Sequence, residues 1–204
     1  MLESKQLAAQ RGAATLFSGL DFSLVPGDAL LVTGANGSGK TTLLRIAAGL
    51  SHASAGTLSW QGAAVRPLDP GLRAAVLYIG HAVALKDDLS AEENLTSLAS
   101  LHAGSASADA VRGALASWAL DGQRALPARA LSMGQRRRIG LARLTLVPRP
   151  LWILDEPAAA LDTAGVALLC NMLGGHLAQG GMAIVATHQD IALPGSTIRG
   201  LSLS

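Results

Sequence analysis

A glycine-rich segment near the N-terminus has the residue types and spacing of a phosphate-binding loop, Gly34-Ala35-Asn36-Gly37-Ser38-Gly39-Lys40-Thr41. Its glycines allow backbone N–H groups to turn inward around phosphate oxygens, and a helix that follows directs its positive end to the same place. Lys40 is then placed to reach terminal phosphates, and the Thr41 hydroxyl to bind Mg²⁺. The alternative is an ordinary glycine-rich turn, which does not explain why one of only three lysines in the chain stands there.

Two adjacent carboxylates, Asp155 and Glu156, follow a run of apolar residues, Leu151–Leu154. The run predicts a strand, and ligands of open α/β sheets bind at the carboxyl ends of strands. We expect Asp155 to hold Mg²⁺ through its water shell, and Glu156 to orient or deprotonate the water that attacks a γ-phosphate. The alternative is a strand that ends in a solvated acidic turn.

Two further polar positions are open to more than one interpretation. Ser132 precedes a helical pattern and Gln135 follows three residues later, which is the spacing of an ordinary capping box. His188 follows Thr187 directly after another apolar run. The simple interpretation is a structural histidine at the end of a strand, with its hydrogen bonds satisfied by neighbouring groups. Taken singly, neither position establishes a site.

Alternating strand and helix patterns surround these residues and predict an α/β fold with a parallel sheet. Strands are predicted at Phe22–Val25, Ala29–Thr33, Ala75–Ile79, Leu151–Leu154 and Met182–Thr187, with short extra strands at Lys5–Ala9 and Thr57–Trp60. Helices are predicted at Thr41–Leu50, Ala91–His102, Ala108–Leu120, Gly134–Leu146 and Gly165–Leu177. The segment from about residue 81 to residue 148 has three helical patterns and no convincing strand, so we expect a helical subdomain inserted into the sheet domain.

The composition is that of one globular domain over residues 1–204. Half of the residues are apolar and the formal net charge is only +2, so the charge does not suggest a nucleic-acid partner. A single cysteine, Cys170, excludes an internal disulfide. We find no uninterrupted apolar run near the roughly 18 residues of a membrane span, and we expect that the chain does not cross a membrane itself.

The order of these motifs resembles that of the ATP-binding-cassette (ABC) ATPases. In that family the glycine-rich segment corresponds to the Walker A loop, Leu131–Gln135 to the signature, Leu151–Glu156 to the Walker B strand, Leu161-Asp162 to the D-loop and His188 to the switch histidine. The resemblance covers nearly the whole chain. It implies a P-loop NTPase domain of the ABC type, with a parallel core sheet, an N-terminal antiparallel β flap and an inserted helical subdomain.

The resemblance also implies ATP hydrolysis in a head-to-tail homodimer, with ATP and Mg²⁺ between two copies of the chain. Glu156, His188 and Lys40 are the implied catalytic residues, and Thr41 and Asp155 the implied metal-binding residues. The implied nucleotide-binding residues are Gly34, Ala35, Asn36, Gly37, Ser38, Gly39, Lys40, Thr41, Thr42, His81, Ser132, Gly134, Gln135 and Asp162. Among them, the signature residues meet the γ-phosphate bound by the other copy, and Asp162 links the two sites.

Two positions depart from the family pattern. The aromatic residue that usually stacks on adenine falls near Arg11, which is either a solvated loop arginine or a planar group that stacks on the base, and we expect weak base selectivity. His81 stands where the Q-loop glutamine is usual. This histidine either faces solvent or takes over the glutamine's role, with hydrogen bonding that depends on its protonation.

A narrower resemblance is to the ATP-binding subunits of haem exporters used in cytochrome c maturation. It rests on the Gly80-His81 pair, the strand Pro150–Pro157 and the short chain, and departs from the expected pattern at Ala82 and Ala158–Ala160. It implies a peripheral ATPase at the cytoplasmic face of the bacterial inner membrane, bound to an integral membrane transporter subunit. The alternatives are the ATPase of another small exporter, for a lipid, drug or peptide, and a soluble ABC ATPase that acts on nucleic acid or ribosomes.

Overall fold

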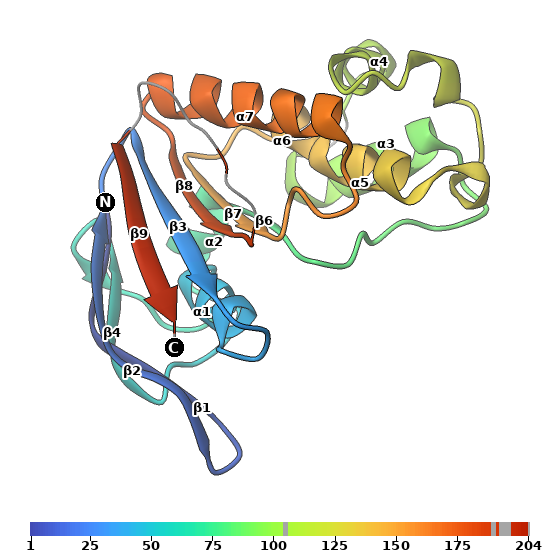
Figure 1. Ribbon diagram of the computed structural model, residues 1–204. Coiled ribbons are helices and arrows are strands. Elements are labelled where there is room, and N and C mark those ends of the chain that lie inside the picture. The colour runs from blue at the N-terminus through green and yellow to red at the C-terminus, as the bar shows by residue number, and fades with distance from the viewer. Residues whose placement is uncertain (104–105, 189–190, 192–196, 204) are drawn as a thin grey trace. The chain divides into compact units, whose positions relative to one another are not determined.

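The computed structural model describes residues 1–103, 106–188, 191 and 197–203, and the chain divides into two compact units (Figure 1). Unit 1 is formed by Met1–Gly80, Arg149–Glu156 and Leu173–Ser204, and unit 2 by His81–Pro148 and Pro157–Met172. Each unit is described by itself below.

A five-stranded parallel sheet forms the centre of unit 1, in the order β6-β7-β8-β3-β9. Its strands are β3 (Asp28–Gly34), β6 (Val76–Ile79), β7 (Leu151–Asp155), β8 (Met182–Ala186) and β9 (Thr197–Leu203). Every residue of β7 and β8 is buried, as expected where a parallel sheet is covered on both faces. The predicted α/β fold with a parallel core sheet is confirmed, although β9 was not predicted.

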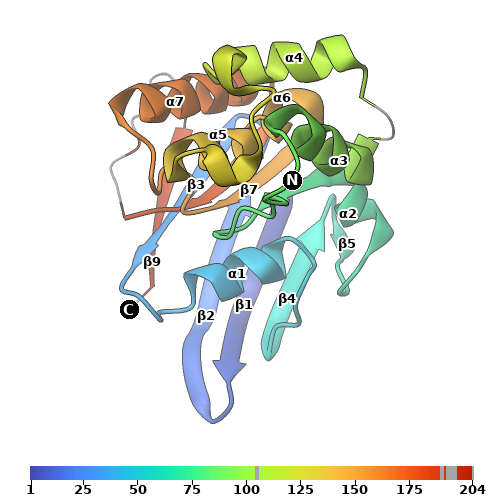
Figure 2. The ribbon, with the colours of Figure 1, turned by 90° about the vertical axis from the view of Figure 1, so that its right-hand side faces the viewer.

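A second, antiparallel sheet in the order β2-β1-β4-β5 contains the N-terminal strands (Figure 2). Its strands are β1 (Leu2–Arg11), β2 (Ala14–Leu24), β4 (Ala55–Trp60) and β5 (Ala63–Ala64). β2 is much longer than the predicted Phe22–Val25, because it pairs with β1 along most of a hairpin. Arg11 is exposed on the last position of β1, opposite Ala14, so it belongs to a strand end rather than to a loop.

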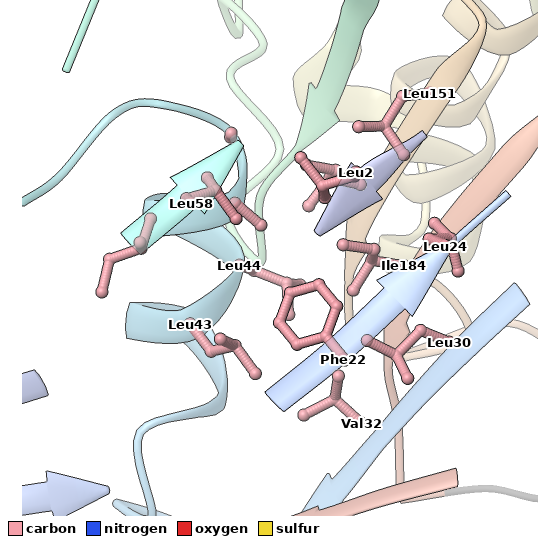
Figure 3. Close-up of a cluster of buried hydrophobic side chains, with 14 of the residues drawn as sticks. Leu2, Phe22, Leu24, Leu30, Val32, Leu43, Leu44, Leu58, Leu151 and Ile184 are labelled. Carbon is pink, nitrogen blue, oxygen red and sulfur yellow. The ribbon is translucent and has the colours of Figure 1, made fainter. Parts of the chain in front are cut away.

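The core of unit 1 is apolar and joins both sheets to helix α1 (Lys40–Ala47) (Figure 3). Leucine and aromatic side chains of the antiparallel sheet point toward leucines of α1 and branched residues of the parallel sheet. The central members of this cluster are Leu2, Phe22, Leu24, Leu30, Val32, Leu43, Leu44, Leu58, Leu151 and Ile184. Burial of each such side chain stabilises the fold by roughly 1.5–3 kcal/mol. This packing holds α1 against the sheets, directly after the loop that follows β3.

A short helix that the sequence analysis missed precedes β6. Helix α2 (Pro70–Ala75) begins after Asp69, whose carboxylate accepts a hydrogen bond from the Leu72 N–H at 2.9 Å. An aspartate at the N-cap followed by proline in the first turn is a recognised start signal for a helix. The signal was therefore present in the sequence.

Unit 2 is helical within the part of the chain that the structure describes (Figure 2). Its helices are α3 (Ala91–Ala103), α4 (Ala108–Ser117), α5 (Met133–Leu141), α6 (Arg143–Leu146) and the first part of α7 (Thr163–Ala178), with short 3₁₀ turns at Asp121–Gln123 and Ala128–Ala130. The single helix predicted over Gly134–Leu146 is wrong. It is broken at Ala142, whose carbonyl accepts a hydrogen bond from the Thr145 N–H three residues later.

None of the helices in the described part of the chain combines the length and the apolar character needed to cross a lipid bilayer.

A tryptophan and a histidine stack at the opposite end of the parallel sheet from the glycine-rich loop. The rings of Trp152 and His176 lie 3.7 Å apart and are inclined by 3°. The imidazole Nε2 lies 3.1 Å from the Met182 carbonyl oxygen, and a Cβ on Gly181 would lie 2.3 Å from the same ring. Burial of His176 between Trp152 and Gly181 lowers its pKa below 6.5. The contact with the Met182 carbonyl partly offsets this shift in pKa.

We predict that His176 makes stability fall on acidification. Since its pKa is lower in the folded chain, the unfolded chain takes up the proton first, and the contribution to stability is lost as the pH falls below about 6.5. His176→Gln keeps a donor for Met182 but does not titrate. Urea unfolding at several pH values should show a steeper loss of stability below that pH for wild type than for the variant, and equal slopes would contradict the prediction.

Candidate nucleotide-binding site

The glycine-rich loop connects β3 to α1, and close contacts together with positive φ angles favour glycine at its two ends. At Gly34 (φ +144°) a Cβ would lie 2.4 Å from the Leu203 carbonyl oxygen. At Gly39 (φ +99°) it would lie about 3 Å from the side chains of Leu16 and Phe17. The glycines thus permit a tight turn directly before the N-terminus of α1, and the backbone N–H groups at a helix N-terminus favour anion binding. The buried Ser38 hydroxyl in this turn has no hydrogen-bond partner among the described residues.

The ammonium group of Lys40 is held inside the loop. Its Nζ donates to the carbonyl oxygens of Gly34 at 2.7 Å and Ala35 at 3.1 Å, and only 7% of the residue is exposed. The lysine therefore has a fixed position at the start of α1. This position is the one expected for a lysine that binds terminal phosphates.

His188 lies among the groups that the sequence singled out. Its Nε2 is 3.0 Å from Lys40 Nζ, 3.1 Å from Asn36 Oδ1 and 3.3 Å from Glu156 Oε1. Lysine is a donor while Asn36 Oδ1 and the carboxylate are acceptors, so the bond that forms depends on whether Nε2 carries a proton. The histidine is therefore more than a polar residue at the end of β8.

Thr41 and Asp155 bring two hard oxygen atoms together. The Thr41 hydroxyl donates to Asp155 Oδ2 at 2.8 Å, and Asp155 is 1% exposed at the end of β7. The Asp155 charge also acts on Tyr78, whose pKa is raised first by burial and then by this carboxylate, while Arg45 lowers it. No cluster of three or more His, Cys, Asp or Glu ligands exists among the described residues. The pair fits an ion that takes only one or two protein oxygens and completes its shell with phosphates and water, as Mg²⁺ does.

Glu156 continues directly from β7 with an uncommon backbone conformation. Its φ is +49°, in the left-handed region that non-glycine residues seldom adopt, and its N–H donates to the Ala186 carbonyl at 3.0 Å. Its side chain is 19% exposed and faces His188. The backbone turn therefore directs the carboxylate to the same edge of the sheet as Asp155.

The residues that the family resemblance implies as the signature lie at the start of α5, in unit 2. The Ser132 hydroxyl accepts from the Gln135 N–H at 3.2 Å, and the Gln135 side chain accepts from the Ser132 N–H at 2.9 Å. The capping box is thus present as a structural feature. Gly134 packs tightly in the first turn, since a Cβ there would lie 2.7 Å from the Ala160 carbonyl oxygen.

Asp162 forms an N-terminal cap for α7 and pairs with α5. Its carboxylate accepts from the Gly165 N–H at 2.8 Å and from Arg138. The hydrogen bond from Gly165, followed by that from Arg138, lowers the pKa of this exposed carboxyl. Asp162 is therefore held as a carboxylate beside the signature helix.

His81 is exposed, and its backbone carbonyl accepts a hydrogen bond from Arg137 Nη1 at 3.2 Å. Arg137 was not predicted to be a site residue. A run of three arginines, Arg136–Arg138, usually indicates a solvated helix face, but Arg137 is only 3% exposed. A usable signal was its helical spacing from Gly134 and Leu141, which places all three on one face.

Comparisons with known proteins agree with this fold. Residues 17–159 match the family described as ABC transporter, and the chain belongs to this family as an ABC-type ATPase with an ATP-binding domain. A solved ATP-binding cassette, a dimer in a post-hydrolysis state with ADP and Pi, superposes with a TM-score of 0.81 at 21% identity, over 93% of this chain and 88% of that one. At that identity the likeness concerns the fold alone.

Closer relatives are found among named export proteins. The chain is 46% identical to cytochrome c biogenesis ATP-binding export protein CcmA 2 of Cupriavidus metallidurans, over 97% of this chain and 94% of the relative. It is 44% identical to cytochrome c biogenesis ATP-binding export protein CcmA of Dechloromonas aromatica, over the full length of both.

We predict opposite effects for two glycine-to-alanine changes. Gly134→Ala places a methyl group against the Ala160 backbone and should destabilise by about 1–3 kcal/mol. Gly174→Ala, inside α7 with no atom within 4 Å of the new Cβ, should stabilise by about 0.4–1 kcal/mol. Denaturant unfolding measures both, and a neutral Gly134→Ala would show that the start of α5 is loosely packed.

Proposed function

We propose that this chain is the ATP-hydrolysing subunit of an ABC exporter in c-type cytochrome biogenesis, energising a separate membrane subunit in haem export. One observation carries the hydrolytic part: Lys40, Thr41, Asp155, Glu156 and His188 meet at one edge of the parallel sheet. The relatives named as cytochrome c biogenesis export proteins support the export part. We place the chain, as one ABC ATPase domain, peripherally at the cytoplasmic face of the bacterial inner membrane.

The phosphates of ATP bind where the loop already presents donors. Lys40 exchanges its contacts with the Gly34 and Ala35 carbonyls for the more strongly accepting phosphate oxygens, and the N-terminus of α1 adds its positive end. The unpartnered Ser38 hydroxyl is a further donor in the loop. These groups neutralise the charge that develops during phosphoryl transfer.

Thr41 and Asp155 are the residues that would hold Mg²⁺. When bound, the ion supplies charge neutralisation on the β- and γ-phosphates. The Thr41 hydroxyl, which donates to Asp155 in this structure, would present its oxygen to the ion, and the buried Asp155 carboxylate would hold the ion through its water shell.

Glu156 and His188 prepare the attacking water. The carboxylate accepts a proton from the water, and the strained backbone at φ +49° holds it in place. His188, 3.3 Å from that carboxylate and 3.0 Å from Lys40, is positioned to contact the γ-phosphate and the water together. A regulatory protein that binds ATP without turnover has no need of this pair.

A second copy of the chain completes the site. In the proposed homodimer, Ser132, Gly134, Gln135 and the N-terminus of α5 meet the γ-phosphate bound by the other copy, and Asp162 links the two sites. The dimer of the structurally similar cassette with ADP and Pi supports this arrangement.

The first test is Glu156→Gln. Loss of the base should lower ATP turnover by about 10²–10⁴-fold, with ATP binding kept and ATP-dependent dimers accumulating. Turnover assays and size-exclusion chromatography with ATP measure this, with Glu92→Gln, on the surface of unit 2, as control. Retained hydrolysis would show that another group prepares the water. Bacteria that depend on the variant should also lack c-type cytochromes, and normal cytochrome content would contradict the export role.

The second test separates helix capping from the signature role. Ser132→Phe and Ser107→Phe each remove a serine N-cap that accepts a backbone N–H at 3.2 Å, and each should cost about 0.5–2 kcal/mol of stability. Only Ser132→Phe should abolish hydrolysis while ATP still binds the monomer. Equal hydrolysis by both variants, or loss of ATP binding by Ser132→Phe, would contradict the shared site.

A further inference from the structure

The three consecutive arginines of α5 have three different sets of partners. Arg136 pairs with Asp87 at 2.6 Å and donates to the Ala128 carbonyl at 3.1 Å. Arg138 pairs with Asp162. Arg137, between them, is the most deeply buried, with 3% of its surface exposed. The run is therefore a set of attachments between α5 and other segments of unit 2.

Arg137 binds the backbone at the two points where the chain passes from unit 1 into unit 2. Its Nε donates to the Pro157 carbonyl and its Nη1 to the His81 carbonyl, both at 3.2 Å. These residues follow directly after Glu156 and Gly80, the last residues of unit 1 at the two crossings. One guanidinium thus joins segments that lie 56 residues before it and 20 residues after it.

The chemistry of this contact requires arginine. A buried cation is costly unless its donors are satisfied, and the planar guanidinium offers donors in several directions, while lysine has one compact ammonium. A second cation, Arg143, lies close by, and its pKa is lowered to about 10 by burial first and by the charge of Arg137 second. The donors that Arg137 directs to the Pro157 and His81 carbonyls help to hold the cation in this buried place.

We propose that Arg137 is a positioning residue that couples the signature helix to the Q-loop position and to the segment after the catalytic glutamate. Arg137 lies five residues after Ser132, about 7.5 Å along one continuous helix. A displacement of α5 at Ser132 therefore moves the guanidinium, and with it the carbonyls of His81 and Pro157. Because Pro157 is joined to Glu156 by a peptide bond, a movement of the Pro157 carbonyl also displaces the Glu156 carboxylate. This inference rests on the proposed ATPase function.

The test compares the same substitution at two adjacent positions. Arg137→Lys loses the hydrogen bonds to the two carbonyls. It should lower kcat about 10–100-fold, because small displacements of catalytic groups reduce the rate strongly. ATP affinity should change less than about twofold. Arg136→Lys should keep near wild-type kcat, since an ammonium still pairs with the Asp87 carboxylate. Turnover, equilibrium ATP titration and thermal unfolding are measured for both. Wild-type kcat in Arg137→Lys, or equal losses in the two variants, would overturn the proposal.

Hydrogen exchange in the wild-type chain provides a measurement that needs no variant. Addition of a non-hydrolysable ATP analogue should slow exchange together in residues 133–141, 81–88 and 157–162. A change in 133–141 without a change in the other two segments would overturn the proposal even if Arg137→Lys does not fold. A wild-type chain that binds no ATP would overturn the proposed function and this inference with it, whereas an active wild type beside an equally active Arg137→Lys would overturn this inference alone.

Discussion

The parallel pairing of three neighbouring strands, β7, β8 and β3, is the constraint on which the site depends. Because parallel strands end at the same edge of a sheet, their order brings Asp155 and Glu156, His188, and the loop to Lys40 together from segments far apart in sequence. β7 and β8 are buried throughout and β3 along most of its length, so the register of the three strands is fixed by the same apolar packing that stabilises the unit. The positions of these polar side chains therefore depend on the apolar residues that pack the strands.

Much of this arrangement was predictable because it rests on local patterns. The apolar runs of β3, β7 and β8, and the glycine spacing before Lys40, are each contained in a few consecutive residues. The length of β2, the existence of β9 and the break at Ala142 were not predicted. Those features depend on pairing with distant strands or on a single shifted hydrogen bond, and periodicity does not encode either.

The candidate site likewise contains residues that local patterns predicted and one that they did not. Residue types and order predicted the residues that meet around Lys40, since phosphate chemistry restricts them to few choices. They did not predict that Arg137 is buried, because its hydrogen bonds to the His81 and Pro157 carbonyls leave no pattern of residue types in the sequence. The capping box at Ser132 shows a further limit: one pair of side chains organises a helix end and lies where the signature is expected, so local geometry alone does not separate the two roles.

Glu156 is constrained from both sides of its position in the chain. On one side, β7 and the hydrogen bond to Ala186 fix its N–H, and its φ of +49° stores strain that only a rigid surrounding maintains. On the other side, the next carbonyl, that of Pro157, accepts a hydrogen bond from a guanidinium on the signature helix. Glu156 thus has its own N–H bonded to the Ala186 carbonyl, and the carbonyl of the next residue bonded to α5. Both hydrogen bonds restrain the backbone around Glu156, so the direction of its carboxylate depends on contacts of the main chain as well as on the turn at φ +49°.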